Sequence, residues 1–215
     1  MSYLAFMKHR RRSIRLPGYD YASAGWYFVT ICCNDRTHLF GEIREGEMVL
    51  NEVGDLVEKW WNKTPEKFPD IELGDYQIMP NHFHAIVINV GADPCVGPSL
   101  PVTPDTLASL QEITGFSKQG EHAGSPLHRV IQWFKTMVTN EFIRNVKQSG
   151  WKPFEDKIWQ RNYYEHIIRN EESHRKISAY IRDNPANWND DDFFLSKPIR
   201  SSKTFYTTKF KRLDF

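Results

Sequence analysis

The chain has 215 residues, and its content of 40% hydrophobic and 26% charged residues is typical of a folded globular protein. This composition excludes a disordered chain. The sequence contains no run of about 18 apolar residues, so we expect no membrane span. The formal net charge of +1 favours no class of partner, and three cysteines do not predict a disulfide framework. The first residues are basic and lack the apolar core of a signal peptide, so we expect a cytoplasmic protein.

Charge gathers at the two ends of the chain. The segments KHRRRSIR at 8–15 and KPIRSSKTFYTTKFKR at 197–212 are basic. Such segments are either solvated tails or arms that contact nucleic-acid phosphates, and charge alone does not decide between them. We expect a basic N-terminal arm at 1–24, a single domain at 25–189 and a C-terminal tail at 190–215.

The first half of the domain alternates predicted strands with a helix. The segment GWYFVTICC at 25–33 is aromatic and β-branched, which predicts a buried strand, and 39–51 predicts a hairpin. Apolar residues at helical spacing over 51–69 predict a helix with an asparagine cap and a proline stop. Two further strands are expected at 70–80 and 82–90, joined by a tight turn.

The second half begins with a segment at 91–125 that is rich in Gly, Pro and Ser and predicts a flexible insertion. It is either an interaction loop or a tolerated insertion. An apolar stripe predicts a long helix at 125–146, and 171–184 predicts a short amphipathic helix halted by Pro185. Between them, 157–169 is compatible with a strand or a helix. This order predicts an α+β fold: a ferredoxin-like antiparallel sheet with helices packed on one face.

Two histidines, His82 and His84, flank Phe83 at the start of an apolar run. In a strand, residues two positions apart point to the same face, so the two imidazoles would project side by side. Two adjacent imidazoles on a rigid strand form a good partial metal site. The alternative is a structural pair that binds no metal.

A second group lies at the end of the last predicted helix. Tyr180 and Asn184 are one helical turn apart. They share a broad side of that helix with Ile177 and Ile181, which would press this side against the sheet. Asn184 precedes Pro185 and is therefore expected at the helix end. If this helix crosses the histidine strand, one site contains two imidazoles, an amide oxygen and a phenol.

These groups suit the cleavage of a phosphodiester. A divalent ion can polarise a phosphate, and a nearby tyrosine hydroxyl can then attack phosphorus and form a phosphotyrosine. Because phenol is a better leaving group than an alkyl alcohol, a DNA 3′-hydroxyl can later displace the tyrosine. Cutting and rejoining then need no external energy.

The motifs MPNHFHAIVI at 79–88 and YIRDNP at 180–185 resemble those of the single-tyrosine HUH transposases, and more narrowly those of the REP-associated tyrosine transposases. The segments WYFVTICCNDRTHLFGEI, IQWFKTMVTNEFIR and IWQRNYYEHIIRNEE resemble the same group, so the resemblance spans most of residues 10–188. It implies a ferredoxin-like fold that binds single-stranded or hairpin DNA near repetitive palindromic elements. Such enzymes nick one strand and hold the 5′ end on a tyrosine.

Carried over by position, the resemblance implies that His82, His84 and Asn184 bind one Mg²⁺ or Mn²⁺ and that Tyr180 is the nucleophile. Insertion-sequence relatives have a glutamine in place of the asparagine, which favours the REP-associated branch. Both a monomer with its tyrosine in cis and a homodimer that exchanges tyrosine helices stay open.

Each role has a rival residue. Tyr163 and Tyr164 are alternative nucleophiles, although core or DNA-stacking aromatics are the simpler interpretation. His166 is an alternative metal ligand. Either Cys32 or Cys33 would convert the histidine pair into a zinc site, but only one of them, because neighbours in a strand point to opposite faces.

Six basic side chains are candidates for DNA phosphate contacts, and each could equally be a solvated surface charge: Arg10, Arg11, Arg12, Arg15, Lys135 and Arg161. We expect Asn81 to make its hydrogen bonds within its turn.

Two further functions compete with DNA transposition. One is a domesticated sequence-specific DNA-binding protein without effective cleavage, and the other is a zinc-dependent hydrolase.

Overall fold

A computed structural model describes residues 24–90, 126–191 and 193–194. Its main feature is an antiparallel sheet with the strand order β4-β5-β1-β6, in which β1 is Gly25–Cys32, β4 is Ile71–Met79, β5 is His82–Asn89 and β6 is Tyr164–Ile168. One helical segment precedes β4 and another precedes β6, so this is the ferredoxin-like order. The predicted α+β class and antiparallel sheet are confirmed.

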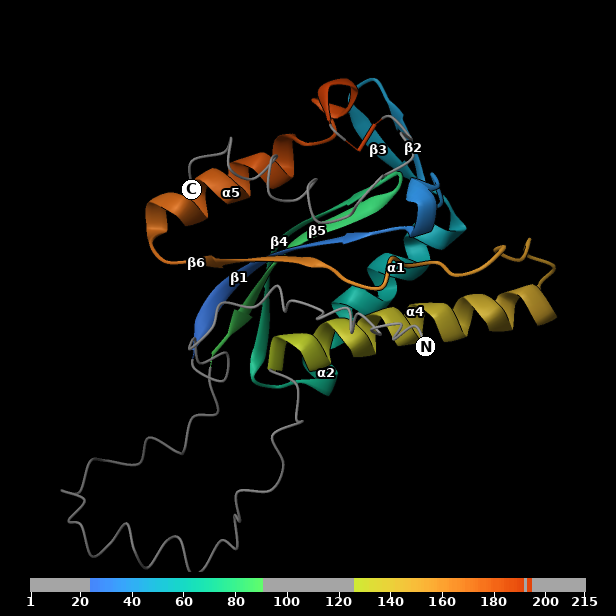
Figure 1. Cartoon of the computed structure of the whole chain (residues 1–215), viewed down its shortest axis with the longest axis horizontal. Helices are drawn as coiled ribbons and strands as arrows, with labels where there is room; N and C mark the ends of the chain where they lie inside the picture. Colours follow the sequence, from blue (N-terminus) through green and yellow to red (C-terminus); the bar gives the residue numbers. More distant parts are fainter. Residues whose placement is uncertain (1–23, 91–125, 192, 195–215) are drawn as a thin grey trace, which may run out of the picture.

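Helices cover both faces of this sheet (Figure 1). Two of them, α1 at Glu52–Asn62 and α4 at Pro126–Gln148, lie on one face, and α5 at Glu171–Asp183 lies on the other. The short helix α2 at Thr64–Lys67 follows α1. No helix in the described ranges is both long enough and apolar enough to cross a membrane.

Strand alternation builds the larger core between the sheet and the α1/α4 pair. The apolar side chains of the central strands β1 and β5 that point to this face are fully buried, and Phe83 of β5 shows the packing. Its ring centroid lies 4.8 Å from that of Trp61 in α1 and 5.5 Å from that of Phe134 in α4. The residue between the two histidines is therefore a core anchor, which fixes the strand on which they stand.

The opposite face has a smaller core under α5. Phe28, Ile86 and Ile168 of the sheet pack against Ile177 and Ile181 of this helix, and all five are at most 5% exposed. The prediction that helices pack on one face is therefore right for α1 and α4 and wrong for α5. The reason is that the central strands are apolar on both faces, so each face needs a cover.

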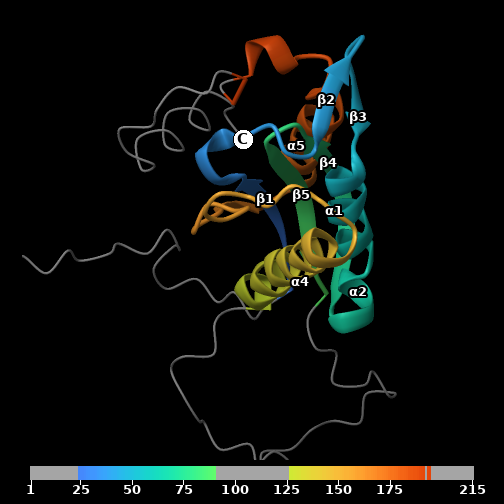
Figure 2. The same cartoon turned by 90° about the vertical axis from the view of Figure 1, so that its right-hand side faces the viewer.

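A hairpin of β2, Gly41–Arg44, and β3, Glu47–Leu50, projects beyond the sheet (Figure 2). Its two turn residues, Glu45 and Gly46, both have positive φ, 52° and 82°, as a tight two-residue hairpin requires. The adjacent helix α1 has the predicted cap, because the Asn51 Oδ1 atom accepts hydrogen bonds from the next turn. The segment of ambiguous pattern at 157–169 contains strand β6.

Several predicted features fall outside the described residues. They are nearly all of the N-terminal arm at 1–24, the insertion at 91–125 and most of the C-terminal tail at 190–215. Within the tail, residues 190, 191, 193 and 194 are described, and Asp191 and Phe193 contribute to the site below. Two short 3₁₀ helices complete the described chain: η1 at Asn34–Arg36 and η2 at Trp188–Asp190.

We predict that Gly54→Ala destabilises the protein, although alanine normally favours a helix over glycine by about 1 kcal/mol. A Cβ atom at position 54 would overlap the carbonyl oxygen of Phe40, so the backbone must move. We expect a loss of about 1–3 kcal/mol in the free energy of unfolding, measured by urea denaturation. The control is Thr136→Ala on the exposed side of α4, which should change stability by no more than about 0.5 kcal/mol. A more stable Gly54→Ala variant would contradict this close packing.

Candidate active site

His82 and His84 lie side by side at the start of β5, on the face that α5 covers. Both side chains are fully buried, and their Nε2 atoms are 2.9 Å apart. They face β1 in the antiparallel register, where His82 pairs with Cys32 and His84 pairs with Thr30. The predicted side-by-side arrangement is present.

The outer nitrogens of both rings have hydrogen-bond partners. His82 Nδ1 lies 2.9 Å from Asn81 Oδ1, and His84 Nδ1 lies 2.8 Å from Thr30 Oγ1. A ring whose Nδ1–H donates to such a partner keeps a lone pair on Nε2 for a metal. Two nitrogens bound to one ion at about 2.1 Å and at right angles lie about 3 Å apart, so the observed separation fits shared coordination.

Tyr180 reaches this pair from α5 of the same chain. Its hydroxyl oxygen lies 3.4 Å from His84 Nε2, and the two ring centroids are 5.3 Å apart. The rings of Tyr180 and Phe28 of β1 form a T-shaped contact at a centroid distance of 6.1 Å. The phenol and the paired imidazoles are therefore neighbours within one chain.

Asn184 lies one turn beyond Tyr180 at the end of α5, as predicted. It is 3% exposed, and its Oδ1 atom has no hydrogen-bond partner in the described structure. A buried amide oxygen without a donor is costly, by about 1–3 kcal/mol. A bound cation would satisfy this oxygen, so the missing donor is consistent with the predicted ligand role of Asn184.

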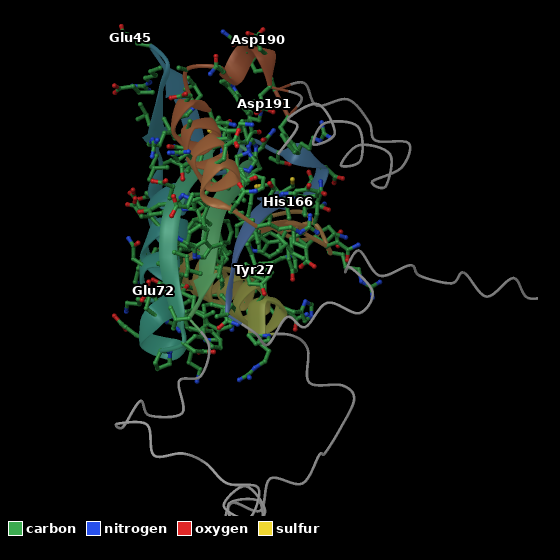
Figure 3. All side chains as sticks on the ribbon, turned by 90° about the vertical axis from the view of Figure 1, so that its left-hand side faces the viewer. Tyr27, Glu45, Glu72, His166, Asp190 and Asp191 are labelled. Atoms are coloured by element: carbon green, nitrogen blue, oxygen red, sulfur yellow. The ribbon has the colours of Figure 1, made fainter. Side chains whose placement is uncertain are left out.

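Asp191 is a candidate ligand that the sequence analysis missed. One carboxylate oxygen of Asp191 and one ring nitrogen each of His82 and His84 lie within 4.8 Å of one another. Asp191 directly follows η2, beyond the end of α5, and Figure 3 shows it beside the exposed Asp190. The sequence around it, NDDDFF, gave no sign of this role, because nothing in its spacing ties it to the histidines.

These residues fit a divalent ion. Two imidazole nitrogens and one carboxylate oxygen are donors that Mn²⁺, Zn²⁺ and related ions accept. Among the described residues, this is the one group of three or more His, Cys, Asp and Glu side chains that is close enough to share an ion. The geometry supports a metal site and does not select the metal.

The histidines are covered by the segment from Trp188 to Phe194, of which the structure describes every residue except 192. The ring centroid of Phe193 lies 4.5 Å from that of His82, and the centroid of Trp188 lies 5.9 Å from it. Cys32 and Met79 complete this small apolar cluster. Trp188 and Phe193 therefore help to shield the His82 imidazole from water.

The rival nucleophiles lie in less suitable places. Tyr163 is 7% exposed in the core on the opposite face, where it stacks on His128. Tyr164 is on the same face as the site, paired in register with Thr30, but burial raises its pKa to about 12. Forming a phenolate there is correspondingly harder.

The rival metal ligands do not join the histidine group. His166 sits on β6 (labelled in Figure 3), and burial lowers its pKa. Cys32 shares the face of His82, whereas Cys33 points to the other face and belongs to the core there. Neither His166 nor a cysteine is part of the group of candidate ligands found in the described residues.

The six candidates for phosphate contacts divide into three cases. Arg10, Arg11, Arg12 and Arg15 lie outside the described residues, and Arg161 is exposed. The ammonium group of Lys135 donates to the carbonyl oxygens of Gln160 and Arg161, at 2.7 and 3.4 Å. A role of these side chains in DNA binding stays a prediction.

Two proteins of Haemophilus influenzae are similar in sequence to this chain. No protein-family model matches the chain. The chain is 37% identical over 189 residues to an uncharacterized protein of Haemophilus influenzae, covering 87% of this chain and 94% of that protein. It is 24% identical over 170 residues to a second Haemophilus influenzae protein, named "Putative REP-associated tyrosine transposase", covering 78% of this chain and 73% of the relative.

Two solved structures resemble the chain. One is a REP-associated tyrosine transposase bound to a REP hairpin, with a TM-score of 0.46 and 17% identity, covering 80% of this chain and 71% of that one. The other is a putative transposase from Deinococcus radiodurans, with a TM-score of 0.35 and 16% identity, covering 79% and 95%. The chain belongs to the same family as the uncharacterized Haemophilus influenzae protein. Its similarity to the second relative agrees with the resemblance found in the sequence, because that relative is named as a putative REP-associated tyrosine transposase.

We predict that Lys135 makes stability depend on pH. Burial lowers its pKa to about 8, whereas an unfolded lysine has a pKa of about 10.4. Between these values the unfolded chain binds a proton that the folded chain lacks, so the free energy of unfolding rises with pH. Urea denaturation from about pH 7 to pH 10.5 should show this rise in the native protein and not in Lys135→Met. An identical pH dependence of the two proteins would contradict a desolvated lysine.

We predict that Asp191→Asn weakens Mn²⁺ binding by at least about tenfold, because it removes a charged ligand. Its neighbour provides a matched control, since Asp190→Asn removes the same charge from an exposed side chain and should change affinity by less than about threefold. Isothermal titration calorimetry measures both affinities. Unchanged binding by Asp191→Asn would exclude this carboxylate from the site.

Proposed function

We propose that this protein is a metal-dependent endonuclease and strand transferase that acts on single-stranded or hairpin DNA of repetitive palindromic elements. The observation that carries the proposal is the position of the Tyr180 hydroxyl, 3.4 Å from the Nε2 atom of His84 in the same chain. The substrate class is taken from the resemblance and from the name of the 24% identical relative. A DNA substrate also favours the expected cytoplasmic location.

His82, His84 and Asn184 would hold one Mg²⁺ or Mn²⁺, and Asp191 is a further candidate ligand. When bound, such an ion supplies positive charge that polarises a phosphate. The chain itself positions the nucleophile, since Tyr180 lies beside the imidazole of His84 and Phe193 packs on the imidazole of His82. This arrangement favours attack by the phenol over attack by water.

The reaction conserves the number of phosphoester bonds. The Tyr180 oxygen forms a bond to phosphorus while the bond from phosphorus to the 3′ oxygen breaks. The phenol proton ends on the departing 3′ oxygen, which leaves as a hydroxyl group, and the 5′ end stays attached to the tyrosine. Because phenol has a pKa near 10, another 3′-hydroxyl can displace it and reseal the strand.

One chain supplies every proposed group of the site, so a monomer suffices for nicking. The catalytic unit then extends beyond the predicted domain at 25–189, because Asp191 and Phe193 belong to it. Arg10, Arg11, Arg12, Arg15 and Arg161 are the proposed contacts to the DNA backbone. Lys135 is a weaker candidate, since its ammonium already donates to backbone oxygens.

One observation favours a second function, sequence-specific DNA binding without effective cleavage. Both histidines are fully buried, and Trp188 and Phe193 pack against them. A protein whose histidines are covered in this way would bind DNA on another surface and would perform no chemistry unless the cover moves. The experiment in the next paragraph separates the two functions.

The test uses a labelled single-stranded hairpin with the full chain in Mn²⁺. We expect a covalent protein–DNA adduct on a denaturing gel that is lost in Tyr180→Phe, by at least about 1000-fold, because Tyr180 is the described residue whose phenol lies beside His84. Tyr164→Phe is the matched control, since it removes a hydroxyl from the same face and should keep the adduct.

Three other outcomes would overturn the proposal. A shifted band on a native gel without any adduct supports the DNA-binding alternative. Cleavage that survives Tyr180→Phe with tightly retained zinc supports a hydrolase. An adduct that depends equally on Tyr164 would remove the assignment of Tyr180.

A further inference from the structure

Asn81 forms more side-chain hydrogen bonds than its expected role in a turn requires. It lies between β4 and β5, it is 1% exposed, and both polar atoms of its amide are engaged. The Nδ2 group donates to the carbonyl oxygen of Arg36 at 3.2 Å and to that of Phe193 at 2.8 Å. The Oδ1 atom lies 2.9 Å from His82 Nδ1. One side chain thus joins η1, the covering segment and the first histidine.

The two carbonyl groups fix which way the amide points. Carbonyl oxygens only accept hydrogen bonds, so the NH₂ side of the amide must face Arg36 and Phe193. The flipped amide would place its own oxygen against two other oxygens and would lose both bonds. The Arg36 carbonyl is presented by a turn in which Asp35 and Arg36 both have positive φ, 50° and 55°. Such a strained turn persists where its surroundings demand it.

The fixed amide in turn fixes the tautomer of His82. With an acceptor oxygen 2.9 Å away, His82 Nδ1 must carry the proton and donate it to Asn81 Oδ1. The Nε2 atom then keeps its lone pair, directed at His84 Nε2 and at the proposed metal position. His82 is therefore held in the form that binds a metal.

His84 is not constrained in this way. Its Nδ1 atom faces the hydroxyl of Thr30 at 2.8 Å, and a hydroxyl can either donate or accept. Rotation of that hydroxyl lets Thr30 pair with either ring form of His84, so Thr30 by itself does not select a tautomer. Without a metal, the lone pair of His82 Nε2 faces His84 Nε2 at 2.9 Å, so this nitrogen of His84 carries the proton. The amide of Asn81 thus selects the ring form of His82, and the ring form of His84 follows from it.

We propose that Asn81 is a positioning residue that sets the metal-binding tautomer of His82, and that the backbone carbonyls of Arg36 and Phe193 act through it. The inference rests on the proposed metal site and adds a residue to it. Only an amide makes all three contacts, because neither a carboxylate nor an aliphatic side chain can donate to two carbonyls. A carboxylate would keep just the contact to the imidazole, and an aliphatic side chain would keep none.

The test compares two variants of similar shape, Asn81→Asp and Asn81→Leu, in the full-length protein. Both lose the bonds to Arg36 and Phe193, but only the aspartate keeps an oxygen facing His82. We expect Asn81→Leu to weaken Mn²⁺ binding, measured by electron paramagnetic resonance, by about 10–100-fold. Asn81→Asp should stay within about threefold of the native affinity, while thermal unfolding shows both variants destabilised alike.

A second measurement does not depend on either variant. Nitrogen-15 NMR of the histidine rings in the metal-free native protein, at a pH of about 8, reports which nitrogen of His82 carries the proton. We expect Nδ1 to be protonated and Nε2 to be unprotonated. A proton on Nε2, or equal loss of Mn²⁺ affinity in the two variants, would overturn the role of Asn81. If the native protein binds no Mn²⁺, the proposed function fails, while the NMR result still decides the tautomer.

Discussion

The site depends on the register between β1 and β5. That register places His82 opposite Cys32 and His84 opposite Thr30, on the face that α5 covers. Because side chains alternate along a strand, a slip of one residue would turn both imidazoles into the α1/α4 core and bring Phe83 to the tyrosine. Phe83 prevents this slip, since its ring is packed between Trp61 and Phe134. The large apolar core therefore fixes the polar site on its reverse side.

Apolar packing also places the phenol. Burying Ile177 and Ile181 contributes about 1.5–3 kcal/mol for each side chain, whereas the contact between the Tyr180 hydroxyl and His84 is at the long limit of a hydrogen bond. The helix is thus held by its isoleucines, and the hydroxyl follows from its place one position before Ile181. In the proposed reaction, the hydroxyl would therefore leave the imidazole and reach a phosphate without loosening the helix.

The sequence predicts the parts of the site that depend on local periodicity. Alternation puts His82 and His84 together, and helical spacing puts Tyr180 and Asn184 on one side of α5. Asp191 could not be predicted in this way, because its approach depends on the path of the chain after Pro185. The role of Asn81 was missed for a similar reason, since its partners Arg36 and Phe193 lie 45 and 112 positions away in the chain. The second helical layer was missed because periodicity does not say which face of a sheet a helix covers.

The proposed chemistry requires that the Nε2 atoms of His82 and His84 bind one cation next to Tyr180. Pulsed electron paramagnetic resonance of the Mn²⁺-loaded protein can decide this, because it detects nitrogen nuclei bound to the metal. We expect couplings to two imidazole nitrogens in the native protein and to one in either His82→Ala or His84→Ala. Mn²⁺ that is bound with no nitrogen coupling would exclude the histidine pair as its ligands.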